Sequence, residues 1–188
     1  MRPVCCNGLV HLNPYGEDPV RLAVALATDR PRTPEDLASR SVAEGVVVDR
    51  APTAQDVAEV NAFLDDWLAV VDADSPRLRA DRLNRLLAES SAHPRITDHA
   101  GDGWHLHYRD AELPLAGVLR ALISVGTALH LTGRGMDRLH RCALTECARP
   151  FGDFSRAGRQ RYCSPACANR DAVRRHRTRR AAGVPQQA

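Results

Sequence analysis

The sequence predicts a mainly α-helical protein with one small β-hairpin, in which a helical N-terminal domain precedes a small four-cysteine module that ends in a basic helix. Three observations support this α+β assignment. Apolar residues recur at spacings of three and four over most of residues 18–135, as they do along a helix face that packs on a core. Residues 95–110 change to a strand-like pattern around a glycine-bearing turn. The last third of the chain has four cysteines in two close pairs, followed by an arginine-rich run.

Four segments of the N-terminal part show helical signals. Residues 19–28 form a compact apolar run that fits either a helix or a buried strand. Residues 34–44 begin with a proline at a first helical turn and end before a glycine. Residues 53–71 begin with a threonine, a preferred N-cap residue, and Ser75-Pro76 begins the next helix. The expected inner faces of the last two helices are Val57, Val60, Leu64, Trp67 and Val71, and then Leu83, Leu86 and Leu87.

Residues 95–110 predict a β-hairpin. The strand-like segments Ile96-Thr97-Asp98 and Trp104–Tyr108 flank the turn Gly101-Asp102-Gly103. Glycine supplies the positive φ that such tight turns require. His105 and His107 share one side of the second strand, with His99 across the hairpin, and an exposed strand face explains them better than a second metal site or an effector contact.

Pro114 opens a long helix, and Thr132-Gly133-Arg134-Gly135 ends it. This glycine-rich end is the expected domain boundary. We therefore expect a leader over residues 1–17, a helical domain over 18–135, the cysteine module over 136–181 and a disordered tail over 182–188. The expected apolar stripe of the long helix consists of Leu115, Val118, Leu119, Leu122, Val125 and Leu129.

The four cysteines predict one structural zinc site. They form two pairs, Cys142-x4-Cys147 and Cys163-x3-Cys167, separated by 15 residues. Each pair can supply two thiolates to a tetrahedral zinc ion, whereas disulfides or unrelated thiols are the competing interpretations. A module of about 40 residues cannot fold by burial alone. Zinc is therefore expected to stabilise it together with three aromatic residues between the pairs, which are Phe151, Phe154 and Tyr162.

Charge is divided unevenly along the 188 residues. Residues 1–137 contain 14 arginines and 20 acids, a net charge of −6, whereas residues 138–188 contain 12 arginines and 3 acids, a net charge of +9. The chain has no lysine, which indicates a general drift towards arginine, but the contrast between the two parts does not depend on that drift. It predicts a polyanion as the partner of the C-terminal end.

The arginine-rich run predicts a helix that carries the charge. Ser164-Pro165 is a helix start, which puts Cys167 in the first turn and extends the helix to about Arg180. Ala172 and Val173 are nearly its only apolar residues, so core packing cannot hold it along its length. Its arginines either remain solvated, or bind phosphates and guanine edges of a nucleic acid, or dock a protein or anionic lipid. The candidate nucleic-acid contacts are Arg170, Arg174 and Arg177 on one face, with Arg175 and Arg179 on a second face.

Together these residues resemble the CGNR zinc-finger family. The resemblance rests on Arg141–Cys147, Phe154-Ser155-Arg156, Arg161–Ser164 and Cys167–Arg170, and it covers roughly residues 138–180. It implies that the four cysteines bind zinc, that Asn169 and Arg170 belong to the DNA-binding signature, and that the protein is a bacterial transcription regulator with an ABATE-type N-terminal domain. Ala168 stands where the signature has glycine, a change that a helix accommodates.

The sequence offers no catalytic residues. It has no nucleophile–base constellation and no phosphate-binding glycine loop, and zinc held by four thiolates has no open position for water. Reduced thiolates favour the cytoplasm. We find no signal peptide and judge every apolar run too short to cross a bilayer, and adjacent Cys5-Cys6 are expected to be incidental thiols. A regulator would need its N-terminal domain to form a homodimer or sense an effector, and no residue identifies such a ligand. The alternative is a zinc-stabilised module that binds protein or RNA.

Overall fold

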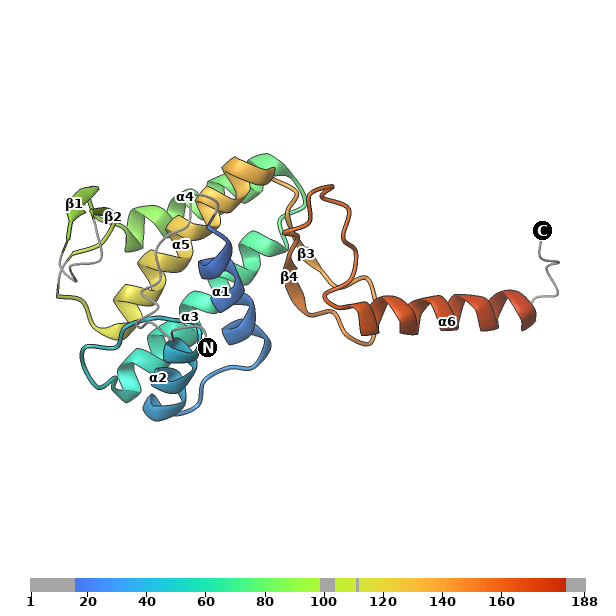
Figure 1. Cartoon of the computed structure of the whole chain (residues 1–188), viewed down its shortest axis with the longest axis horizontal. Helices are drawn as coiled ribbons and strands as arrows, with labels where there is room; N and C mark the ends of the chain where they lie inside the picture. The colour runs from blue at the N-terminus through green and yellow to red at the C-terminus, as the bar shows by residue number, and fades with distance from the viewer. Residues whose placement is uncertain (1–15, 99–103, 111, 182–188) are drawn as a thin grey trace, which may run out of the picture.

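The computed structural model describes residues 16–98, 104–110 and 112–181, and this part of the chain contains six helices and four short strands. The first five helices form a bundle at one end of the molecule, and the sixth projects from the other end (Figure 1). The predicted mainly α class is confirmed, with two small β-hairpins where the sequence predicted one. The helices are α1 (Glu17–Thr28), α2 (Pro34–Ala43), α3 (Ala54–Val71), α4 (Pro76–Ser90), α5 (Leu115–Arg134) and α6 (Pro165–Ala181).

The four strands form two antiparallel hairpins. The predicted hairpin consists of β1 (Arg95–Thr97) and β2 (His105–His107), with Ile96 opposite Leu106. Its predicted turn, Gly101-Asp102-Gly103, lies outside the described residues, as do the leader up to residue 15 and the tail. The sequence did not indicate the second hairpin, in which β3 (Leu139–Arg141) pairs with β4 (Pro150–Gly152).

Local capping explains where the helices begin. The side chain of Thr53 accepts a hydrogen bond from the backbone N–H of Asp56 at 3.3 Å, and the Asp56 carboxylate accepts one from the backbone N–H of Thr53 at 2.8 Å. This reciprocal pair is a capping box. Asp56 also accepts from the N–H of Ala116 in the first turn of α5 at 2.9 Å, so one buried carboxylate joins the starts of two helices.

Helix α5 lies at the centre of the bundle, where it packs against α1, α3 and α4. The buried Trp67 of α3 donates from its indole nitrogen to the Thr127 hydroxyl of α5 at 3.0 Å. The predicted stripe of α5 is only half right, because three of its members are partly exposed. A helix surrounded by three others buries small and polar residues too, and the fully buried positions include Ala116, Leu119, Ile123, Thr127 and His130.

The expectation that every apolar run is too short to cross a bilayer is wrong for α5. This helix of 20 residues is long and apolar enough to cross a membrane by length and composition, and it is the one such helix among the described residues. Most of its apolar stretch is buried inside the bundle, however. The same pattern belongs to the core helix of a folded domain, so hydropathy alone does not distinguish the two.

The β3–β4 hairpin rests directly on the helical domain. Leu139 of β3 belongs to the main hydrophobic core, and β4 packs against α1. The close contact requires a glycine in β4, because a Cβ at Gly152 would lie 2.9 Å from the Val20 side chain and 2.7 Å from the Phe154 ring. The predicted boundary at Gly135 stays a prediction, and the hairpin just beyond it shares the core of the helices.

A buried arginine and an exposed one reinforce this junction. The guanidinium of Arg79, which is 8% exposed, donates to the carbonyl oxygens of Val70, Val71 and Ala73 at 3.0–3.1 Å, and also to that of Met136 after α5. It therefore caps the end of α3 and holds the chain that leads to β3. Two hydrogen bonds of 2.7 and 2.8 Å join Arg141 of β3 to the Asp72 carboxylate.

Candidate metal centre and nucleic-acid interface

The four predicted cysteines come together at one point. Their sulfur atoms all lie within 4.8 Å of one another, and the Sγ atoms of Cys147 and Cys163, and of Cys163 and Cys167, are 3.6 and 3.7 Å apart. Tetrahedral zinc with bonds of about 2.3 Å requires neighbouring sulfurs about 3.8 Å apart. The cluster therefore fits one zinc ion, and it is the one group of this kind found in the described part of the chain.

The first cysteine pair sits on a tight turn. The N–H of Cys147 donates to the carbonyl oxygen of Leu144 at 2.8 Å, and Ala148 adopts a φ of 47° to complete the turn. Leu144 is fully buried beneath the sulfurs. The N–H of Ala143 donates to the carbonyl oxygen of Arg161 at 2.8 Å, which joins this turn to the segment that carries the second pair.

The second pair spans the start of α6. The Ser164 hydroxyl accepts from the N–H of Cys167 at 3.3 Å, which is the predicted N-cap, and Pro165 is the first helical residue. Cys163 thus precedes the helix and Cys167 lies in its first turn. Ala168, in place of the signature glycine, continues the helix with its N–H bonded to the Ser164 carbonyl at 3.2 Å.

The thiols differ in acidity. A hydrogen bond with the Ser164 side chain lowers the pKa of Cys167 to about 7, whereas burial and the neighbouring cysteines raise the pKa of Cys163 to about 12. Zinc binds thiolates, so its binding must displace the protons that remain. The metal–sulfur bonds would then hold together the two chain segments that carry the cysteine pairs.

This arrangement defines a small structural zinc-binding module. Residues 138–180 match the family model of the CGNR zinc finger, in agreement with the resemblance seen in the sequence. The match covers the module, and the ABATE-type assignment of the helical domain remains a prediction. A comparison with curated proteins finds no match to this chain.

Helix α6 leaves the zinc site and extends away from the molecule (Figure 1). From Ala172 to Ala181 every residue is exposed, and only Cys167 and Asp171 are buried. The predicted contact residues Asn169, Arg170, Arg174, Arg175, Arg177 and Arg179 all lie on this exposed helix. The structure places them as expected, and whether they bind nucleic acid stays a prediction.

Asp171 is a residue that the sequence analysis missed. It is 5% exposed and accepts from the Tyr162 hydroxyl at 2.6 Å, from Arg174 at 2.5 Å and from Arg175 at 2.9 Å. The hydrogen bond from Tyr162, followed by that from Arg174, lowers the pKa of Asp171 despite the opposing effect of burial. Asp171 is the only acid in α6, a signal that could have identified it. It fixes α6 against the zinc module one turn beyond Cys167.

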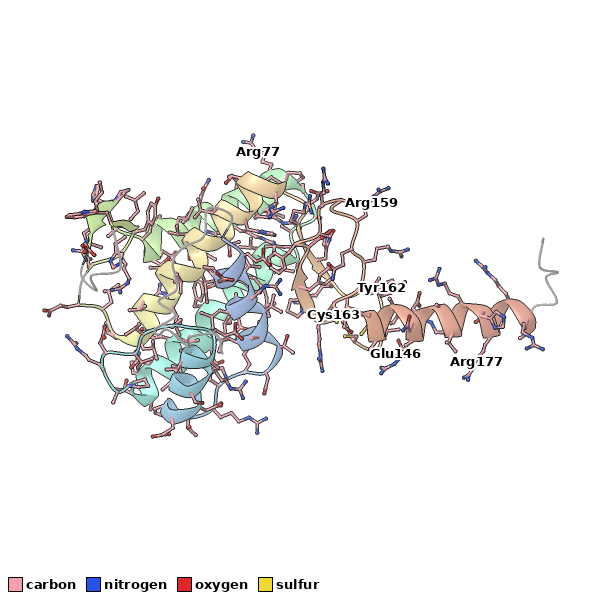
Figure 2. All side chains as sticks on the ribbon, viewed as in Figure 1. Arg77, Glu146, Arg159, Tyr162, Cys163 and Arg177 are labelled. Atoms are coloured by element: carbon pink, nitrogen blue, oxygen red, sulfur yellow. The ribbon has the colours of Figure 1, made fainter. Side chains whose placement is uncertain are left out.

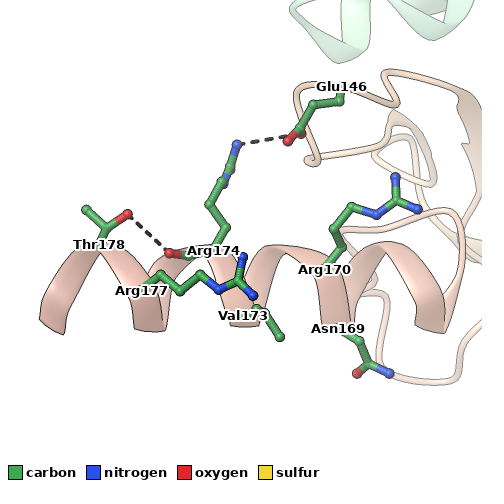
Figure 3. Close-up of a pocket in the computed structure, with 7 residues that line it drawn as sticks. All are labelled: Glu146, Asn169, Arg170, Val173, Arg174, Arg177 and Thr178. Atoms are coloured by element: carbon green, nitrogen blue, oxygen red, sulfur yellow. Dashed lines mark hydrogen bonds and ion pairs between the residues drawn. The ribbon is translucent and has the colours of Figure 1, made fainter. Parts of the chain in front are cut away.

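One face of α6 borders a shallow groove of about 450 Å³. Arg174 reaches from this face towards Glu146 in the first cysteine turn, 3.6 Å away, while Asn169 points away from that turn (Figure 3). Arg177 and Arg170 have no acidic partner among the residues described. The groove is lined by Glu146, Asn169, Arg170, Val173, Arg174, Arg177 and Thr178.

The three aromatic residues do not form a core around the zinc. Phe151 is buried beside His140, with 5.4 Å between ring centres, and Phe154 packs edge-on against His130 of α5 at 4.9 Å. The guanidinium of Arg21 lies over the Phe154 ring at 4.3 Å. Only Tyr162 packs beside the cysteines. The expected position beside the zinc ligands is therefore confirmed for Tyr162 and wrong for Phe154, which packs on the helical domain, while Cys142, Leu144 and Cys167 form a small hydrophobic cluster of the module's own.

The weaker candidates lie elsewhere. Asp65 of α3 is exposed and forms a 2.6 Å ion pair with Arg30, so it lies on the solvent side of that helix. His107 is half-buried, whereas His99 and the His105 side chain lie outside the described residues, as do Cys5 and Cys6.

Proposed function

We propose that this protein binds duplex DNA by inserting α6 into the major groove, and that it acts as a transcription regulator. The observation that carries the proposal is the exposure of α6, a helix with six arginines and one acid that is held at its base by a zinc site. A helix that lacks a packing face and bears this charge is suited to a polyanionic ligand. An α-helix with its side chains is about 10–12 Å wide, and the major groove of DNA has a similar width of about 12 Å.

The distribution of side chains around α6 suggests how it would sit. At about 100° per residue, Asn169 and Val173 share one face with Arg180. Arg170, Arg174 and Arg177 lie on one side of this face, and Arg175 and Arg179 lie on the other. Asn169 and Val173 point away from the cysteine turn (Figure 3). We therefore place these two side chains against the base edges, where asparagine pairs with adenine and an apolar group contacts the thymine methyl. The flanking arginines then meet phosphates.

The positions of the three aromatic rings weigh against the RNA-binding alternative. Single-stranded RNA is usually held by exposed aromatic rings on which bases stack. In this module Phe151 is buried, Phe154 packs on the helical domain, and Tyr162 is half-buried with its hydroxyl bonded to Asp171. A protein partner for α6 is the remaining alternative, and the experiment below distinguishes it.

The wider regulatory role is part of the proposal. A cytoplasmic regulator of this kind would act as a homodimer or respond to an effector through its helical domain. The measured mass of the zinc-loaded protein in solution tests the homodimer, since a monomer at all concentrations would leave one finger for each DNA site.

The test is retention of genomic DNA. Zinc-loaded protein is incubated with sheared DNA from its own host at about physiological salt, and the retained fragments are sequenced. An Arg170/Arg174/Arg177→Glu variant reverses the charge of one α6 face. A matched variant, Arg32/Arg77/Arg85→Glu, makes the same charge change at exposed positions of the helical domain.

The expected result is a small set of recurrent sites for the wild type and the matched variant, and loss of these sites for the α6 variant. If α6 makes about four to six phosphate contacts, these alone contribute a slope of about −4 to −5 to the fall of the logarithm of the affinity with the logarithm of salt. Uniform retention would indicate backbone binding alone. No retention by the wild type would refute DNA binding and favour a protein partner.

A further inference from the structure

We infer that residues 155–161 form a second phosphate-binding element of the zinc module. This element contacts one strand of the DNA major groove, and Arg170 and Arg177 contact the other strand. This inference rests on the proposed function. Arg156, Arg159 and Arg161, which lie outside α6, would bind the phosphate backbone of duplex DNA.

A buried carboxylate fixes the shape of this loop. Asp153 is 0% exposed and accepts from the backbone N–H groups of Ser155 and Gln160 at 2.8 and 2.9 Å, and from the Ser155 hydroxyl at 2.5 Å. These hydrogen bonds lower its pKa although burial acts in the opposite direction. Both ends of the loop are therefore bound to one charged group.

Arg138 supports the loop from below. Its guanidinium donates to the carbonyl oxygens of Arg134, at the end of α5, and Ser155, at 2.9 and 2.7 Å, and lies 3.7 Å from the Asp153 carboxylate. Gly158 passes over this guanidinium with a φ of 65°, and a Cβ there would lie 2.5 Å from the central carbon of the Arg138 guanidinium. A surface loop that is held by a buried ion pair presents its outer side chains in a defined arrangement.

Those outer side chains are arginines. Arg156, Arg159 and Arg161 are exposed, and none has an acidic partner among the residues that the structure describes. Residues 154–170 contain four arginines and no acid. Guanidiniums are strong donors to phosphate oxygens, and because the backbone of this loop is already fixed, binding would have to order only the side chains.

The loop is continuous with the second face of α6. The Arg161 guanidinium lies 5.9 Å from the Tyr162 ring centre, and the Tyr162 hydroxyl donates to Asp171, which also pairs with Arg175. Arg161 and Arg175 therefore flank the same buried contact. Arg179 follows Arg175 by four residues and lies on the same side of the helix. We call Arg156, Arg159, Arg161, Arg175 and Arg179 the loop face.

The loop face and the shallow protein groove that borders α6 lie on different sides of this helix. Figure 2 shows Arg159 on one side of the α6 axis and Arg177 on the other. Because the helix fills the width of the major groove, its two sides meet the two phosphate backbones. The side of α6 that carries Arg170 and Arg177 then contacts one DNA strand, and the loop face contacts the other strand.

The experiment measures the salt dependence of binding by the full zinc-loaded protein to a duplex of about 20–30 base pairs taken from the retained fragments. The loop variant is Arg156/Arg159/Arg161→Gln, and the matched control is Arg32/Arg77/Arg85→Gln. Zinc content and the thermal transition of each variant are measured first to establish that it is folded.

We expect the loop variant to lose about 0.9 of the salt slope for each phosphate contact removed, about 2.7 in total. If the affinities converge at about 1 M salt, this predicts binding about 100-fold weaker at about 0.15 M. Its preference among DNA sequences should remain that of the wild type, because phosphates carry no base information. The control should retain the wild-type slope.

Two results would overturn the inference in different ways. A loop variant with the wild-type slope and affinity would show that the loop does not touch DNA, while the role of α6 would stand. A wild type that binds no duplex would refute the proposed function together with the loop contact. A loop variant that changes the sequence preference would also contradict a contact limited to phosphates.

Discussion

Removal of zinc should unfold α6 and leave the helical domain intact. The perturbation is either chelation of the metal or Cys163→Ser, which takes one thiolate from the site. Helices α1 to α5 contain 12, 10, 18, 15 and 20 residues, and α6 contains 17. Because α6 has no packing face beyond its first turns, loss of the zinc site should remove about a fifth of the helical signal in circular dichroism. Structural zinc contributes on the order of 10–16 kcal/mol in small fingers, which a few buried side chains cannot replace.

The helical core provides an internal control for this measurement. Trp67 is fully buried and bonded to Thr127, so its near-ultraviolet signal and its thermal transition should persist without zinc. The β3–β4 hairpin should persist as well, because Leu139 and Phe154 pack on the helical core. Loss of all helical signal would refute the reasoning, since it would make finger and helices one cooperative unit. An unchanged signal would refute it too, by showing that α6 does not need the metal.

Three further changes test the packing and the caps. The pKa of Asp56 is lowered in the folded protein, because hydrogen bonds from Ala116 and Thr53 outweigh the effect of burial. The ionised carboxylate therefore stabilises the fold fully above its unfolded pKa of about 3.9, and this stability is lost as the pH falls through its folded pKa. Asp56→Asn should flatten the decline in the free energy of unfolding below about pH 4. Arg79→Met should lower the free energy of unfolding by about 3 kcal/mol in denaturant titrations, because it leaves buried carbonyls without donors, and a loss below about 1 kcal/mol would contradict this. Gly152→Val should cost about 1–3 kcal/mol by overpacking at α1, whereas an exposed Ala157→Val should change the thermal transition little.

The features that the sequence predicted well are local ones. Thr53, Ser75 and Ser164 begin helices through bonds to backbone groups three residues away, and such signals can be seen in a short window of sequence. The zinc ligands are equally visible, because thiolate spacing reflects the geometry of the metal. The ambiguous run at residues 19–28 became α1 because it packs on α5 and the hairpin, which its own pattern does not contain.

The features that the sequence did not predict depend on distant partners. Arg141 and Asp72 are 69 positions apart, and Asp56 and Ala116 are 60 apart. The aromatic rings were assigned to the zinc module because they are near it in the chain, but Phe154 is bound by Arg21 and His130 of other elements. The loop face was missed for the same reason, since Arg161 and Arg175 meet only through Tyr162 and Asp171.

The attachment of the β3–β4 hairpin to α1 determines the direction in which α6 points. Helix α6 is about 25 Å long, at 1.5 Å per residue. A tilt of about 10° at its base would therefore move its far end by about 4 Å, roughly the distance between successive base pairs. Since the base is bonded to the hairpin and the hairpin to the helical domain, a small rotation of α1 becomes a displacement of one base-pair step at the tip of α6.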